Sequence, residues 1–149
     1  DHIFGNKLVY DTFGLKPQFH QLELRLLEAA GEYSKQWGIF LEPSPTAEKY
    51  LNEGDIISFG NLSFEILFTP GHSPGSLCFY HKQHKIVIGG DVLFQMSIGR
   101  YDLPGGDEQT LLNSIRTQLF TLPADVKVLP GHGPETTIGF EKMYNPFLV

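Results

Sequence analysis

Three short apolar runs of this chain each lead into a glycine-containing turn that carries a histidine or an aspartate. The turns lie at residues 69–75, 89–91 and 129–133, and their side chains are His72, Asp91 and His132. Short apolar runs favour strands, and glycine allows the backbone to turn sharply where a strand ends. Side chains at the mouths of successive strands can point into one common site. The pattern therefore predicts a catalytic metal site at the ends of several strands.

The chain opens on another pair of potential ligands, Asp1 and His2. Histidine and aspartate bind zinc, and in oxygen-rich surroundings they also bind iron or manganese. A single histidine in a turn is more often structural or exposed, but four such positions in one chain are hard to explain without a metal. Asp91 lies between the two histidine turns, so we expect its carboxylate to be shared by two ions.

The rest of the sequence predicts an α/β fold in which strand pairs are followed by helices. Helices are expected at residues 1–13, 21–36, 46–51, 107–119 and 140–144, from helical spacing and capping residues. Strands are expected at residues 56–59, 62–68, 77–81, 85–88 and 126–129, from aromatic and β-branched enrichment. Asp107 is the expected N-cap of the fourth helix. His81 and His84 flank a predicted hairpin loop and are expected to be solvated. Helices should cover part of the sheet in a single domain over residues 1–149.

Charge and composition limit the partners and the compartment. A net charge of -6 argues against a nucleic acid or an anionic membrane as partner. No apolar stretch approaches the ~20 residues of a membrane-spanning helix. The one cysteine, Cys78, lies in an apolar run where a buried role is expected. The absence of disulfide pairs indicates a cytoplasmic location.

Four motifs in combination resemble those of the metallo-β-lactamase superfamily. They are Asp1-His2, TPGHSPGS at residues 69–76, GGDVLF at 89–94 and PGHGP at 130–134. The segment SIGRYDLPGG at residues 97–106 is similar to the branch of small hydrolases related to glyoxalase II (hydroxyacylglutathione hydrolase). The resemblance implies an αββα sandwich with metals at one edge between two sheets. His72 would bind the first metal and Asp91 would bridge both. The second metal would be bound by Asp1, His2 and His132.

The opening motif of that family is His-x-His-x-Asp-His, and this sequence starts at its final Asp-His pair. We therefore expect the chain to lack the two leading histidines and the first strands of the sandwich. The first metal would keep only His72 and Asp91, too few ligands for a secure site. We expect the chain by itself to bind at most one metal.

Residues 71–75 also match the Gly-x-Ser-x-Gly pattern of a serine nucleophile elbow. Pro74 follows Ser73 and has no N–H for an oxyanion hole, and the next segment is a predicted strand rather than a helix. A serine nucleophile is therefore disfavoured. Arg100 and Asp102 are interpreted as an ion pair that fixes a long loop, in preference to substrate contacts.

We predict a metal-dependent hydrolase of a small-molecule thioester such as an S-acyl-glutathione. A metal-bound hydroxide would attack the carbonyl, Asp91 would position the metals, and Asp1 would orient the hydroxide and take up its proton. Zinc, as one or two ions, is the expected cofactor, with iron or manganese as alternatives. Two other hypotheses stay open: a one-iron persulfide or thiol dioxygenase of the same fold, and a catalytically silent module kept for packing or interaction. The sequence defines neither a substrate-binding residue nor an oligomeric state.

Overall fold

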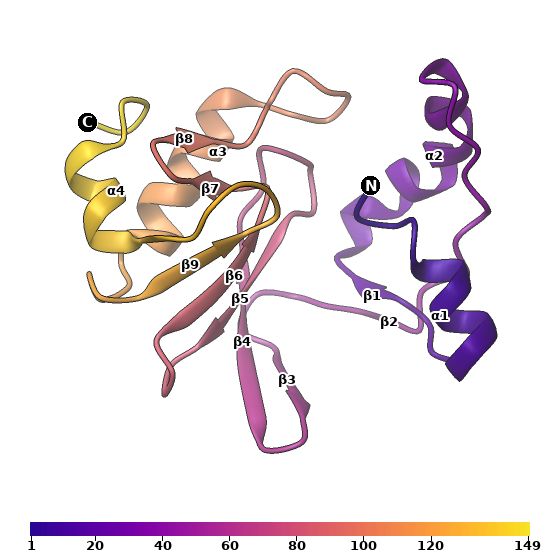
Figure 1. The fold of residues 1–149 in the computed structure, drawn as a ribbon, viewed down its shortest axis with the longest axis horizontal. Helices are drawn as coiled ribbons and strands as arrows, with labels where there is room; N and C mark the ends of the chain where they lie inside the picture. Colours follow the sequence, from indigo (N-terminus) through magenta and orange to yellow (C-terminus); the bar gives the residue numbers. More distant parts are fainter. The chain divides into compact units, whose positions relative to one another are not determined.

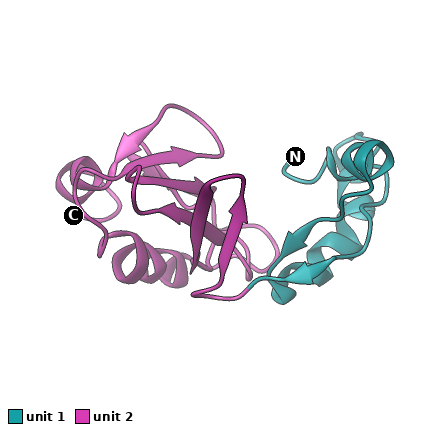
Figure 2. Cartoon of the chain, turned by 90° about the horizontal axis from the view of Figure 1, so that it is seen from below, with its two compact units in different colours: residues 1–51 teal, residues 52–149 magenta.

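A computed structural model describes all residues 1–149, and the chain forms two compact units (Figures 1 and 2). Unit 1 is Asp1–Leu51, drawn in teal in Figure 2, and unit 2 is Asn52–Val149, drawn in magenta. The units are described separately below, and the single domain over residues 1–149 stays a prediction. None of the helices is long and apolar enough to cross a membrane.

Unit 1 consists mainly of two helices. The first, α1 (Asn6–Phe13), ends at Gly14, which has a left-handed φ of 70° and donates its N–H to the carbonyl of Tyr10. A short 3-10 turn, η1 (Gln21–Glu23), leads into α2 (Leu24–Gln36). The predicted helices at residues 1–13 and 21–36 are confirmed, although the first begins only at Asn6.

The helical turn expected at residues 46–51 is wrong. Instead β2 (Lys49–Tyr50) pairs in parallel with β1 (Gln18–Phe19). The backbone N–H of Leu51 also donates to the carbonyl of Phe19 over 3.0 Å. Six residues are too few to nucleate a helix without tertiary support, and the partner strand is remote in sequence, so no local pattern indicated this pairing.

Unit 2 is built on a six-stranded sheet with the strand order β10-β9-β6-β5-β4-β3 (Figure 1). Its strands are β3 (Ile56–Phe59), β4 (Leu62–Phe68), β5 (Leu77–His81), β6 (Ile86–Gly90), β9 (Lys127–Pro130) and β10 (Thr136–Thr137). All neighbours are antiparallel except β6 and β9, which are parallel. The five predicted strands are confirmed to within two residues at their ends.

Helices cover one face of this sheet. They are α3 (Glu108–Ser114), the π-helical segment η2 (Ile115–Leu119) and α4 (Ile138–Tyr144). Asp107 caps α3 as predicted, because its Oδ1 accepts the N–H of Thr110 over 2.8 Å. A small hairpin of β7 (Leu93–Phe94) and β8 (Ser97–Ile98) also contributes to the core. The core joins the two layers through Leu67, Cys78, Tyr80, Val87, Val128, Leu111, Ile115, Leu119 and Ile138.

Two polar side chains of β5 differ in how well the sequence predicted them. Cys78 is buried as expected, and burial raises the pKa of its thiol to about 12. His81 was expected to be solvated, which is wrong, because it is only 5% exposed. Its ring packs edge-on against Phe64, and its Nδ1 accepts the N–H of His84 over 3.2 Å. The loop that follows β5 folds back over the ring, and this return is not visible in the sequence.

Candidate metal centre

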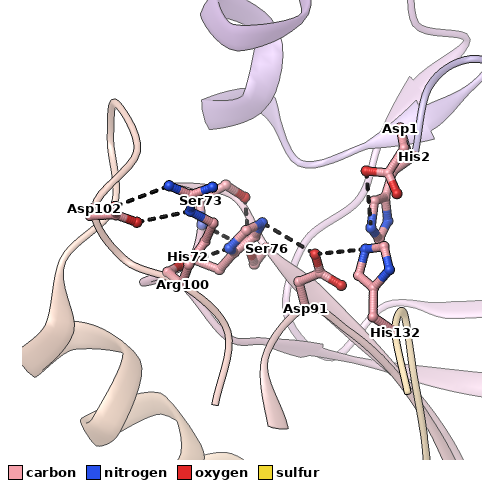
Figure 3. Close-up of polar contacts among 9 residues, drawn as sticks. All are labelled: Asp1, His2, His72, Ser73, Ser76, Asp91, Arg100, Asp102 and His132. Carbon is pink, nitrogen blue, oxygen red and sulfur yellow. Dashed lines mark hydrogen bonds and ion pairs between the residues drawn. The ribbon is translucent and has the colours of Figure 1, made fainter. Parts of the chain in front are cut away.

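Strand direction brings three of the predicted ligands to one edge of the sheet. Because β4 and β6 are each antiparallel to β5, they run in the same direction, and β9 is parallel to β6. The carboxyl ends of β4, β6 and β9 therefore lie at the same edge. His72, Asp91 and His132 follow these three ends, and Figure 3 shows Asp91 between the two histidines.

The ligand atoms of these three residues point toward one another. His132 Nε2 lies 3.4 Å from Asp91 Oδ2, and His72 Nε2 lies 3.7 Å from the same oxygen (Figure 3). The Asp91 side chain is 13% exposed and that of His72 is 21% exposed, whereas that of His132 is 56% exposed. The Asp91 carboxylate is therefore much less exposed than the imidazole of His132.

The tautomer of His72 is set by a main-chain contact. Its Nδ1 lies 2.8 Å from the carbonyl oxygen of Arg100. A carbonyl oxygen only accepts, so Nδ1 must carry the proton and donate it. In the neutral ring, Nε2 then carries a lone pair that faces Asp91 Oδ2. This is how a metal-binding histidine is commonly oriented, with its second nitrogen bonded to a carbonyl.

The donor set fits a divalent cation. Two ligand atoms that each lie ~2.0–2.2 Å from one tetrahedral zinc ion are separated by about 3.3–3.6 Å. The His132–Asp91 distance falls in this range, and the His72–Asp91 distance is close to it. A lone pair that faces a carboxylate oxygen is repulsive without a positive charge between them. Imidazole and carboxylate donors suit zinc, iron or manganese.

Glycines allow the turns to approach their neighbours closely. Gly71 has a φ of 133°, and its carbonyl accepts the N–H of Asp107 at the start of α3 over 2.8 Å. Gly131 donates its N–H to the carbonyl of Gly90 over 2.8 Å, which joins the turn after β9 to the end of β6. Ser114 holds the turn of His72 from the helix side, because its hydroxyl donates to the carbonyl of Pro70 over 2.7 Å.

Asp1 and His2 lie next to each other at the start of unit 1. His2 Nε2 is 4.0 Å from Asp1 Oδ1, and both side chains are exposed. Their participation in a site with residues of unit 2 stays a prediction, as does the bridging role of Asp91.

The loop after β8 adds a contact that sequence reasoning missed. Arg100 and Asp102 form the predicted ion pair, with Nε donating to Oδ1 over 2.8 Å and Nη2 donating to Oδ2 over 3.0 Å. This pairing lowers the pKa of Asp102 and raises that of Arg100. The backbone carbonyl of the same Arg100 accepts the hydrogen bond from His72 Nδ1 (Figure 3). No residue type signals a main-chain acceptor, so only the structure reveals this partner.

The serine-nucleophile alternative finds no support in this geometry. The hydroxyls of Ser73 and Ser76 are hydrogen-bonded to each other, with their oxygens 2.7 Å apart. The Nδ1 of the adjacent His72 is engaged by the Arg100 carbonyl. Ser73 therefore lacks the arrangement of base and hydroxyl that activates a nucleophilic serine.

Comparison with known proteins identifies the family of the chain. The model of the metallo-beta-lactamase superfamily matches residues 1–132. The chain belongs to the metallo-β-lactamase superfamily. It is 44% identical, over 99% of its length, to the probable metallo-hydrolase YqgX of Bacillus subtilis. The same identity and coverage apply to the hydroxyacylglutathione hydrolase GloC of Haemophilus influenzae.

The chain spans 71% of the length of each of these two relatives. It also matches a protein of Aquifex aeolicus with 46% identity over 105 residues, which is 50% of that protein.

Solved structures show the same fold. A crystal structure of TTHA1623 in a di-iron-bound form has a TM-score of 0.91 and 40% identity, covering 99% of this chain and 72% of that one. The structure of ETHE1 from Myxococcus xanthus has a TM-score of 0.65 and 31% identity, covering 79% of this chain and 55% of that one. The predicted fold class and the relation to metallo-hydrolases are thereby confirmed. The family implies a divalent metal.

Proposed function

We propose that the protein represented by this chain hydrolyses a small-molecule thioester of the hydroxyacylglutathione class. The observation that carries the proposal is the convergence of His72, Asp91 and His132 on one point at the edge of the sheet. The name of the relative GloC supports the substrate class. The proposed partner is a small molecule in a cytoplasmic setting, rather than a nucleic acid or a membrane.

The proposed reaction assigns metal binding and catalysis to five residues of the chain. His72, Asp91 and His132 would hold the metal, with Asp1 and His2 completing the set. When bound, a divalent metal supplies hydroxide at neutral pH and polarises the thioester carbonyl. Asp91 would set the position of the cation, because its carboxylate lies between both histidines. Asp1 would orient the attacking water and accept its proton.

Two further contacts would keep the ligands oriented for this task. The proton on His72 Nδ1 is held by the Arg100 carbonyl, so Nε2 stays available for the metal. The ring of Phe94 lies edge-on to that of His132, with centroids 6.4 Å apart. It thereby limits the rotation of an imidazole that is otherwise exposed.

The test uses the full-length protein with an S-(hydroxyacyl)glutathione substrate and follows the loss of the thioester. We expect turnover that a chelator removes and that added zinc, iron or manganese restores. Ser73→Ala should retain activity, because Ser73 has no assigned role in the reaction. Turnover that survives complete metal removal, or that disappears in Ser73→Ala while the metal content is normal, would contradict the proposal.

A one-iron dioxygenase acting on a persulfide or thiol is the second candidate, and the 31% identity to the ETHE1 structure fits it. The iron-loaded full-length protein would then consume dioxygen in the presence of glutathione persulfide and leave thioesters intact. The hydrolase proposal expects the opposite pattern of activity.

The third hypothesis, a catalytically silent module, is tested by metal analysis of the full-length protein. A protein purified without chelators that neither contains nor takes up a divalent metal would favour the silent module. Zinc is our proposed native ion, and the di-iron form of TTHA1623 makes iron the ion to compare with it.

A further inference from the structure

A buried carboxylate lies on α4, on the side of unit 2 that carries the β7–β8 hairpin. Glu141 has no exposed surface. Its Oε1 accepts the hydroxyl of Thr136, and its Oε2 accepts the N–H of Met96 over 3.0 Å and the side-chain N–H of Asn145 over 2.7 Å. A buried carboxylate is costly unless such donors compensate it. All three donors are neutral groups, so this residue serves to fix geometry rather than to form an ion pair.

One group that Glu141 holds, the N–H of Met96, belongs to the turn between β7 and β8. Met96 has a φ of 56°, a left-handed conformation that is unfavourable for a residue with a side chain. Asn145, also fully buried, donates from its side chain to the carbonyl of Ser97 over 3.0 Å. Glu141 on α4 therefore holds an N–H of the turn, and Asn145, directly after α4, holds a carbonyl at the start of β8.

The hairpin connects this turn to two of the proposed ligands. It starts just after Asp91, and it closes where the N–H of Gly99 donates to the carbonyl of Val92 over 3.1 Å. Gly99 packs so tightly that a Cβ there would lie 1.8 Å from the Asp91 carbonyl oxygen and 3.5 Å from the Cβ of His72. The next residue, Arg100, provides the carbonyl that accepts the hydrogen bond from His72 Nδ1.

We propose that Glu141 is a positioning residue of the metal centre, acting through the β7–β8 hairpin on Asp91 and His72. The proposal rests on the proposed metal centre. Glu141 holds the turn, the turn sets the path of the hairpin, and the hairpin fixes both the backbone of Asp91 and the hydrogen bond that orients His72. Loss of a partner that orients a ligand commonly weakens metal binding by about tenfold to a hundredfold.

The test compares two substitutions of similar size in the full-length protein. Glu141→Met removes both acceptors, whereas Glu141→Gln can keep its oxygen toward Met96 and Asn145 and turn its amide toward the Thr136 hydroxyl. The dissociation constant for Zn²⁺ is measured by competition with a chromophoric chelator. We expect Glu141→Met to weaken binding by about tenfold or more, and Glu141→Gln to stay within a few-fold of the unchanged protein.

A matched control separates positioning from general loss of stability. Leu119→Ala empties a fully buried position of the same core that lies in η2 rather than in the hairpin. It should lower the melting temperature while leaving Zn²⁺ affinity unchanged. Equal Zn²⁺ affinity of folded Glu141→Met and the unchanged protein would overturn the proposal.

A second variant and a second readout cover the remaining outcomes. If Glu141→Met does not fold, Asn145→Ala takes its place, with a weaker affinity expected and an unchanged affinity counting against the proposal. If the unchanged protein binds no Zn²⁺, the proposed function fails and the hairpin is judged by NMR. The hydrogen bond from His72 Nδ1 to the Arg100 carbonyl should make the Nδ1 proton detectable in the unchanged protein. This signal should be lost in the variant, and its retention would overturn the inference.

Discussion

Gly71 lies directly against the backbone of Leu111, so that a Cβ on Gly71 would stand 2.3 Å from the Leu111 Cα. This contact places the turn that carries His72 on the first residues of α3. The φ of 133° at Gly71 is also one that other residues rarely adopt. The turn and the helix therefore depend on the absence of a side chain at this single position.

Substitution Gly71→Ala should destabilise unit 2. The unfavourable φ alone is expected to cost ~1–3 kcal/mol, and the contact with Leu111 adds to it because a helix backbone cannot move aside. Urea unfolding followed by circular dichroism measures the change. Gly31→Ala is the control, since no atom lies within 4 Å of a Cβ there. A helical alanine at that position should be neutral or stabilise by up to ~1 kcal/mol, and an equal effect of both changes would contradict the prediction.

The cap of α3 makes the stability of unit 2 sensitive to acid. Hydrogen bonds from Thr110, from its side chain and its backbone N–H, lower the pKa of Asp107. A carboxyl group with a lower pKa in the folded than in the unfolded state stabilises the fold at neutral pH. That contribution is lost as the pH falls below about 4 and through the folded pKa. Asparagine caps helices nearly as well but does not titrate.

We therefore expect Asp107→Ala to lower the melting temperature at pH 7, and Asp107→Asn to lower it less. The difference between the unchanged protein and Asp107→Asn should shrink as the pH is lowered toward 3, because protonation of Asp107, which occurs first in the unfolded chain, removes the contribution of its charge. Melting temperatures measured between pH 3 and pH 7 check this. A difference that grows in acid would show that the charge of Asp107 does not contribute as described.

Cys78 should be chemically inert in the folded protein. Its thiol is fully buried, is bonded to the Thr69 hydroxyl and the Gly89 carbonyl, and has a pKa raised to about 12. Because the thiolate is the reactive form, a disulfide reagent at pH 8 should label Cys78 only after a denaturant is added. Gln83→Cys, on the exposed loop after β5, provides a thiol that should react at once. Stoichiometric labelling of native Cys78 on the same timescale would be incompatible with its burial.

Asp91→Ala in the full-length protein should abolish metal loading and turnover together, since its carboxylate is central to the proposed ligand set. Asp125→Ala is the matched change, because Asp125 is exposed and pairs with Lys85 on the surface. Metal content by elemental analysis and thioester turnover are measured for both. Normal metal content and activity in Asp91→Ala would rule out the mechanism.

The positions of His72, Asp91 and His132 could be predicted because each follows a short apolar run and is flanked by glycine. Strand runs and turn glycines are local features of the sequence. Because β4, β6 and β9 run in the same direction, the residues that follow them lie at the same edge of the sheet. The N-cap role of Asp107 was equally accessible, since a cap depends on residues within one turn.

Contacts between distant segments were not accessible to the same reasoning. The sequence gives no sign that Glu141 is buried, because a glutamate on a short amphipathic helix is normally exposed. Its burial depends on the N–H of Met96, which lies far away in the sequence. The two-residue pairing of β1 with β2 is similarly non-local. The exposure of His81 was predicted wrongly for a related reason. The loop after β5 folds back so that the N–H of His84 contacts the His81 ring, and the sequence does not show this fold.

The placement of the candidate ligands just after the carboxyl ends of β4, β6 and β9 has a consequence for folding and for hydrogen exchange. A metal held there would join three strands that are brought together only when most of unit 2 has assembled. Metal uptake should therefore follow the formation of the sheet rather than initiate it. A cation that binds only the assembled sheet adds its binding free energy to the folded state. The amide protons at the ends of β6 and β9 should then exchange with solvent more slowly when the metal is bound than when it is absent.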